Sequence, residues 1–180
     1  MLCLHGYHGS AAVLRQQMAP LLASDVDDLE PVFVDAPSLA EGDFGWWHAG
    51  FRGWERTRDW VANVLRAGPR FDGVFGFSQG AALAGLVADL AEYSDDPALR
   101  LDFAVLVGGF AGPQPVRPVS IRSAHVIGRN DLVVAPDDSR ALADRFVDPL
   151  LLDHQGGHVI PSDPRLLDRL RRFLRGTPLT

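Results

Sequence analysis

The chain has 180 residues, 47% of them hydrophobic, which is enough for one domain with a sizeable core. Its formal net charge of -6 argues against nucleic acid and an anionic membrane surface as partners. A single cysteine excludes a disulfide within the chain, and no segment resembles a membrane span or a signal peptide. We therefore expect one domain over residues 1–180 in a cytoplasmic protein.

Short apolar runs recur along the whole chain and predict strands. They lack strict apolar/polar alternation, which is typical of strands buried on both faces of a parallel sheet. The predicted strands are "LCLHG" (2–6), "PVFVDA" (31–36), "GVFGF" (73–77), "LDFAVLVGG" (101–109), "AHVIG" (124–128) and "PLLLDH" (149–154).

Helical patterns lie between these runs. One begins after Ser10, and Pro20 should kink or split it. Another is the last helix, with Asp163 as its cap, Pro164 at its first position and Gly176 as its end. The others are expected near 55–67, 79–93 and 136–146.

This alternation predicts a doubly wound, mostly parallel α/β sheet of about six strands. With strand order 2-1-3-4-5-6, the topological switch point lies between the first and third strands, and a ligand should bind at their carboxyl ends. The first strand runs into "HGYHGS" and the third into "GFSQGA", so the site is expected between these two turns.

Two connections are unusual. Residues 38–53 carry Phe44, Trp46 and Trp47, and such a long aromatic loop indicates a function, here contact with the substrate. We expect one tryptophan to pack down and the other to face an acyl chain, the alternative being that both close the core. Residues 109–120 hold three prolines, which predicts a stiff loop in place of a crossover helix.

The candidate nucleophile is Ser78, in the G-x-S-x-G sequence "GFSQG" between a predicted strand and a predicted helix. A tight turn would explain the glycines alone, but a nucleophile also requires them: side chains at Gly76 or Gly80 should collide with neighbouring elements. A serine needs a base to take its proton. His158, in the loop "QGGHVIP" after the last strand, is the predicted base, and His154 at the end of that strand is its rival.

A carboxylate must orient the imidazole. Asp131 follows the fifth strand and precedes His158 in the chain, so it is the predicted third member. Asp102 would lie at the wrong end of the sheet, and Asp137 and Asp138 are better explained by the first turn of a helix.

The oxyanion hole needs two backbone donors, and the predicted ones are the N–H groups of Gln79 and Tyr7. No Cys, His or carboxylate cluster has the spacing of a metal site, so we expect neither a metal nor an organic cofactor.

With these residues assembled, the chain resembles the FSH family of serine hydrolases, within the α/β-hydrolase superfamily. The resemblance rests on "LCLHGYHGSAAVLRQQ", "GFSQGAALA", the Gly-Arg-Asn-Asp step and "GGHVIP", with the paired tryptophans as the family's aromatic loop. It implies an α/β-hydrolase fold with Ser78, Asp131 and His158 as triad; the chain is short for the family, which implies that there is no cap domain. The implied activity is hydrolysis of a small or carrier-bound carboxylic ester or thioester.

Two other readings stay open. An acyltransferase or lyase could use the same fold and triad. A flavodoxin-like binding protein could hold phosphate in "HGYHGS", although the chain has neither P-loop glycine spacing nor a lysine.

Overall fold

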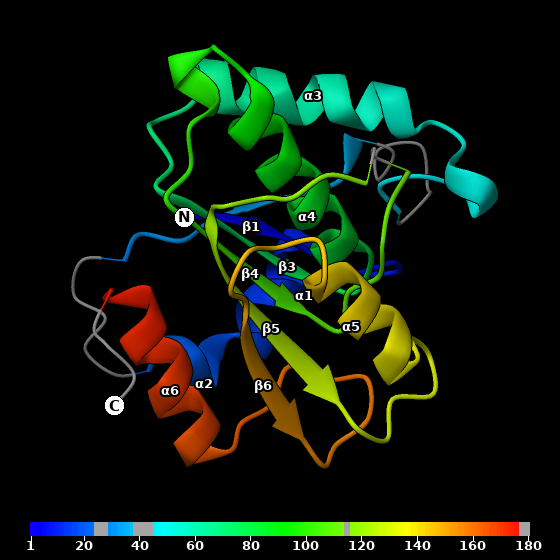
Figure 1. Cartoon of the computed structure of the whole chain (residues 1–180), viewed down its shortest axis with the longest axis vertical. Coiled ribbons are helices and arrows are strands. Elements are labelled where there is room, and N and C mark those ends of the chain that lie inside the picture. The colour runs from blue at the N-terminus through cyan, green and yellow to red at the C-terminus, as the bar shows by residue number, and fades with distance from the viewer. Residues whose placement is uncertain (24–28, 38–44, 114–115, 177–180) are drawn as a thin grey trace.

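The structure is a computed structural model, and it describes residues 1–23, 29–37, 45–113 and 116–176. Within these ranges the chain forms a parallel six-stranded sheet of order β2-β1-β3-β4-β5-β6, which confirms the predicted order (Figure 1). The strands are β1 (Leu2–Leu4), β2 (Val32–Val34), β3 (Gly73–Phe77), β4 (Phe103–Val107), β5 (Arg122–Gly128) and β6 (Leu150–His154).

Helices cover both faces of the sheet. One apolar cluster joins one face to α3, α4 and α5, and a second joins the other face to α1, α2 and α6. The α-helices are α1 (Ala11–Gln17), α2 (Ala19–Leu22), α3 (Trp54–Ala67), α4 (Gln79–Tyr93), α5 (Pro136–Ala143) and α6 (Pro164–Leu174). This is the doubly wound arrangement that the alternating sequence predicted.

The helix boundaries follow local chemistry. The Ser10 side chain accepts the Val13 N–H and caps α1, and the helix divides at Met18 because Pro20 lies in the next turn. The Asp163 carboxylate caps α6 ahead of Pro164, as predicted.

One helix is shorter than predicted. The chain leaves α5 at Ala143, three residues before the expected end, and Phe146 then forms an isolated parallel bridge with Val119. The Phe146 N–H bonds the Ala143 carbonyl in a tight turn, so this segment joins the proline-rich loop.

The described part of the loop at 109–120 forms no helix, as its prolines predicted. Arg117 holds it to α4 through two hydrogen bonds of 2.7 Å to Asp89, and its guanidinium lies 3.7 Å from the centre of the Tyr93 ring. Arg117 is therefore held against the last two turns of α4.

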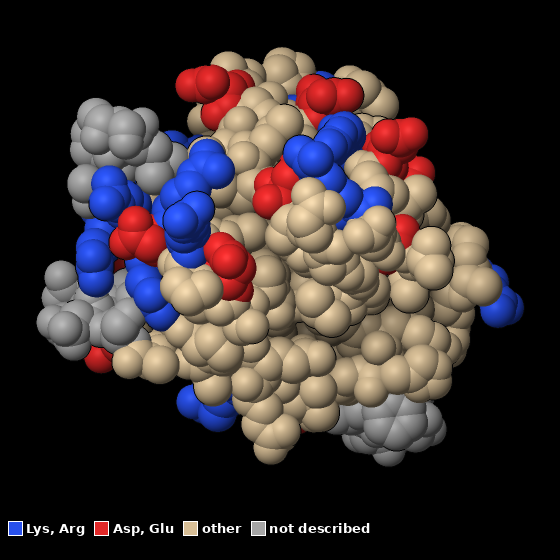
Figure 2. Space-filling model, turned by 90° about the horizontal axis from the view of Figure 1, so that it is seen from below, with Lys and Arg blue, Asp and Glu red and all other residues tan. Residues whose placement is uncertain are grey.

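The carboxyl ends of the strands share one edge of the sheet. In Figure 1 the arrows of β5 and β6 point down toward it. Seen from below, the molecule shows few charged side chains over its lower half, while arginines gather toward the left (Figure 2). Among the described helices, none is long and apolar enough to cross a membrane.

Candidate active site

Ser78 occupies a strained turn between β3 and α4. Its backbone has φ 56° and ψ -120°, a conformation that L-residues rarely adopt. A Cβ added at Gly76 would lie 2.1 Å from the Gly80 carbonyl oxygen, and one added at Gly80 would lie 2.1 Å from the Leu4 oxygen. The predicted collisions are confirmed, and only glycine allows strand, turn and helix to come this close.

Asp131 and His158 form a direct pair. The His158 Nδ1 lies 2.6 Å from Asp131 Oδ2, although the two residues follow different strands. Asp131 Oδ1 accepts the N–H groups of Val133 and Val134, both at 2.9 Å, which fixes the carboxylate on its own turn. One oxygen is thus held by the backbone and the other is directed at the imidazole.

The charge state of Asp131 follows from this surrounding. Burial raises the pKa of the carboxyl, but hydrogen bonds from His158, Val134 and Val133 outweigh burial and hold its pKa below the usual value. Asp131 is therefore an anion across the neutral range and favours a proton on the facing Nδ1.

The His158 ring lies against the end of β3, next to the serine. The centre of the imidazole ring is 4.9 Å from the centre of the ring of Phe77, which is the residue before Ser78. On its other side Gly108 has φ +55°, and a Cβ there would lie 3.2 Å from the imidazole Cε1 and Nδ1. The ends of β3 and β4 thus confine the ring. Within the described residues the Ser78 hydroxyl makes no hydrogen bond.

The turn after β1 lies close to the serine. The Gly9 N–H bonds the Gly6 carbonyl at 3.0 Å, with His8 at φ 58° inside the turn. A Cβ at Gly6 would lie 3.2 Å from Ser78 Cβ, which places the following residue, Tyr7, at the nucleophile. Tyr7 itself is 52% exposed.

His5 holds this turn. Its Nε2 accepts the Ala36 N–H at 3.0 Å, so the proton is on Nδ1, which donates to the Gly6 carbonyl at 2.8 Å. Burial, above all, lowers the pKa of His5 and keeps the ring neutral. His5 therefore acts as a tether of this turn.

Gln79 has two parts with different surroundings. Its backbone N–H is in the first turn of α4, where no helical carbonyl precedes it. Its buried side chain accepts the Trp46 N–H at 2.8 Å and donates to the Trp47 carbonyl at 2.9 Å. This bridge was not expected from the sequence, in which Gln79 offered only a backbone donor.

Both tryptophans of the aromatic loop are buried, with exposed fractions of 2% for Trp46 and 6% for Trp47. The Trp46 indole donates to the His5 carbonyl at 2.7 Å and packs against Trp60. Trp47 packs among Phe51, Trp54 and Phe110, and also lines a hollow of about 400 Å³ beside Gln79. Phe44 lies outside the described residues.

An open cleft of about 590 Å³ reaches Ser78. Tyr7 and Gln79 border it on the nucleophile side, and apolar side chains form most of the remaining wall. The sequence did not single out Phe110, Ala111, Val133, Val134 or Ala141, and it assigned Asp138 to a helix turn only. The described residues that line it are Tyr7, Phe51, Ser78, Gln79, Phe110, Ala111, Val133, Val134, Asp138 and Ala141.

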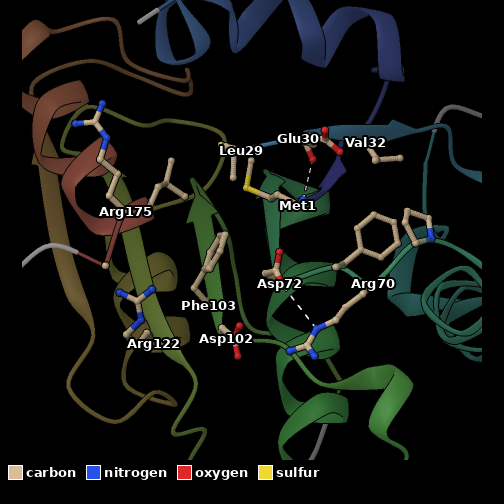
Figure 3. Close-up of a pocket in the computed structure, with 14 residues that line it drawn as sticks. Met1, Leu29, Glu30, Val32, Arg70, Asp72, Asp102, Phe103, Arg122 and Arg175 are labelled. Atoms are coloured by element: carbon tan, nitrogen blue, oxygen red, sulfur yellow. Dashed lines mark hydrogen bonds and ion pairs between the residues drawn. The ribbon is translucent and has the colours of Figure 1, made fainter. Parts of the chain in front are cut away.

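The rival residues lie elsewhere. The Nδ1 of His154 accepts the Gly156 N–H at 3.1 Å, in the turn that leaves β6. Asp102 lines another cavity of about 590 Å³ at the amino ends of the strands, as its place in the sequence predicted. Figure 3 shows that cavity, in which the Met1 amino group donates to the Glu30 carbonyl and Arg70 pairs with Asp72.

Among the described residues, no group of three or more His, Cys, Asp or Glu is placed to hold a metal ion. A doubly wound parallel sheet with a serine in its strand-to-helix turn, beside a histidine paired with an aspartate, defines the α/β-hydrolase class. Solved structures agree with this fold. The acyl-protein thioesterase 2 of Zea mays aligns with a TM-score of 0.71 at 21% identity, over 97% of this chain and 91% of that one. The Bacillus cereus carboxylesterase aligns with a TM-score of 0.72 at 16% identity, over 97% and 86%.

The chain belongs to the family described as Serine hydrolase (FSH1), which matches residues 1–169. Esterase OVCA2 of Xenopus tropicalis is 33% identical over 199 residues, covering 90% of this chain and 86% of the relative. Esterase OVCA2 of Homo sapiens is 34% identical over 205 residues, covering 90% and 89%. The protein is thus an esterase, a carboxylic ester hydrolase.

Proposed function

We propose that the protein hydrolyses carboxylic esters or thioesters through an acyl-enzyme on Ser78, with His158 as base and Asp131 as its orienting carboxylate. The observation that carries this proposal is the strained Ser78 turn beside an imidazole whose Nδ1 lies 2.6 Å from Asp131. With Nδ1 bonded to an anion, the remaining nitrogen, Nε2, is the one available to take the serine proton.

Acylation begins when Ser78 Oγ attacks the carbonyl carbon and its proton passes to His158 Nε2. The oxyanion is stabilised by the N–H groups of Tyr7 and Gln79. His158 then protonates the leaving alcohol or thiol, and the acyl group stays on the serine. Asp131, already ionised, stabilises the imidazolium that forms in this step.

Deacylation reverses these roles. Water loses a proton to His158 as it attacks the acyl carbon, and the second tetrahedral intermediate releases a carboxylic acid and the free serine. The acyl group occupies the cleft beside Ser78, where Phe51, Phe110 and Val134 offer apolar contact. A small ester or a carrier-bound thioester could both enter, because the cleft is open.

The test is covalent labelling combined with a substrate panel. A fluorophosphonate probe should label the wild type with one equivalent and Ser78→Ala not at all. Ser162→Ala is the matched control, since Ser162 is exposed in the loop that follows His158. A series of p-nitrophenyl esters and acyl thioesters then identifies the substrate class. Labelling or hydrolysis that persists in Ser78→Ala would overturn the proposal, and transfer of the acyl group without hydrolysis would favour an acyltransferase.

A further inference from the structure

We propose that Asp138 selects the acyl group by charge: its carboxylate disfavours acyl chains with an anionic far end and favours those with a cationic one. This inference rests on the proposed function, because it needs the acyl group in the cleft beside Ser78. It concerns specificity, which the family relationship leaves undefined.

The placement of Asp138 supports this role. It lies in the first turn of α5 and lines the cleft together with Val134 and Ala141. Asp138 and Ala141 are three residues apart in α5, so they lie on one face of the helix, and this face forms part of the cleft wall. Asp138 comes four residues after Val134, whose N–H is bonded to Asp131.

The carboxylate is not neutralised by a neighbour. Of the described residues that line the cleft, Asp138 is the single one with a formal charge. Its carboxylate makes no ion pair within the described residues. Arg140, two positions along the same helix, is engaged by Asp153 at 3.2 Å. A substrate in the cleft would meet an uncompensated negative charge.

The start of α5 does not require an acid at this position. Its N-cap is Ala135, and both Asp137 and Asp138 follow in the first turn, where either anion interacts favourably with the helix dipole. Asp137 is also exposed but is absent from the described lining of the cleft. The two residues thus form a matched pair that differs in access to the substrate.

The size of the effect follows from Coulomb's law. Asp138 is exposed and the cleft is open, so the field is that of a water-screened charge at a few ångströms. We expect a factor of about 3 to 10 in the preference between cationic and anionic acyl chains of equal length.

The experiment uses three p-nitrophenyl esters of similar length: hexanoate, the adipate half-ester with its free carboxylate, and 6-(trimethylammonio)hexanoate. The measured quantity is the ratio of kcat/KM for the cationic ester to that for the anionic ester. A general loss of activity cancels in this ratio, so a partly impaired variant is still informative. Asp138→Asn should lower it by about 3- to 10-fold, and Asp137→Asn should change it by less than about 2-fold.

A second measurement needs no variant. In 1 M NaCl the wild-type ratio should fall toward that of Asp138→Asn, because the Debye length is then about 3 Å. The inference is overturned if Asp137→Asn and Asp138→Asn shift the ratio equally, or if salt and both variants leave it unchanged. The proposed function has a separate readout: it fails if the wild type does not cleave the neutral hexanoate or if Ser78→Ala still does.

Discussion

Replacing Gln79 by glutamate is a sharp perturbation of the link between the oxyanion turn and the aromatic loop. The side chain keeps its size and keeps an oxygen for the Trp46 N–H. The amide nitrogen that donates to the Trp47 carbonyl at 2.9 Å becomes an oxygen, so two acceptors face each other in a site that is 7% exposed. Gln79→Glu therefore loses a hydrogen bond and leaves a buried carbonyl without a donor.

The cost can be bounded from these contacts. Removing one partner of a buried hydrogen bond costs about 1–3 kcal/mol. For a chain of this size, that corresponds to a melting temperature lower by roughly 2–10 °C. If the glutamate is protonated, its O–H can donate to the Trp47 carbonyl again. The folded state should therefore raise the pKa of the new carboxyl. The stability that the variant loses relative to the wild type should be largest at neutral pH and should shrink as the pH falls toward about 4.

Catalysis should respond as well, since the Gln79 N–H is a predicted oxyanion donor. In other enzymes, loss of one oxyanion-hole donor lowers kcat by about 100- to 1,000-fold. In Gln79→Glu the donor is displaced and not lost, so we expect kcat to fall by about 10-fold. KM should change less than kcat, because the oxyanion forms after substrate binding.

The assay is thermal unfolding between pH 4.5 and 7.5 together with steady-state kinetics at pH 7.5. Gln16→Glu is the matched control, with the same chemical change on the exposed surface of α1. The reasoning is refuted if the two variants unfold alike at every pH, or if Gln79→Glu changes KM and leaves kcat as it was.

Three further outcomes are expected. Asp131→Asn should retain the fold and lose kcat by several orders of magnitude, because an amide stabilises the wrong tautomer of His158; an equal loss in Asp137→Asn would mean that the wrong carboxylate was chosen. If Trp47 contacts two or three methylenes of the substrate, Trp47→Ala should lower kcat/KM by about 10- to 60-fold on long acyl chains and little on acetyl esters. For Trp46→Ala we expect a loss of kcat/KM that is the same at every chain length. The same uniform loss in Trp47→Ala would mean that Trp47 belongs to the core alone. Burial lowers the pKa of His125 to about 3. Since the unfolded state then binds the extra proton, stability should fall by up to about 1.4 kcal/mol for each pH unit below 6.5, and a His125→Met variant that kept the full pH dependence in thermal melts would contradict this.

The sequence by itself determined the sheet and the turn that holds the serine. The alternation of apolar runs and helices indicated a parallel doubly wound sheet, because right-handed crossovers leave few topologies, and the order supposed for it, 2-1-3-4-5-6, is the one the structure has. The turn at Ser78 follows from Gly76 and Gly80, since the backbone atoms they meet at 2.1 Å exclude any side chain. The first constraint comes from chain direction and the second from close contact between backbone segments, one of them the end of β1 at Leu4.

The tertiary structure decided the direction of side chains in irregular segments. The sequence predicted that one of Trp46 and Trp47 packs down and that the other faces an acyl chain. Both residues are buried, Gln79 bonds the backbone of each, and Trp47 also lines the hollow beside Gln79. The sequence likewise assigned Asp138 to the start of a helix, and only the packing of α5 against Gly109 brings it to the cleft. Such contacts join segments separated by tens of residues, and the pattern of apolar residues within one segment does not predict them.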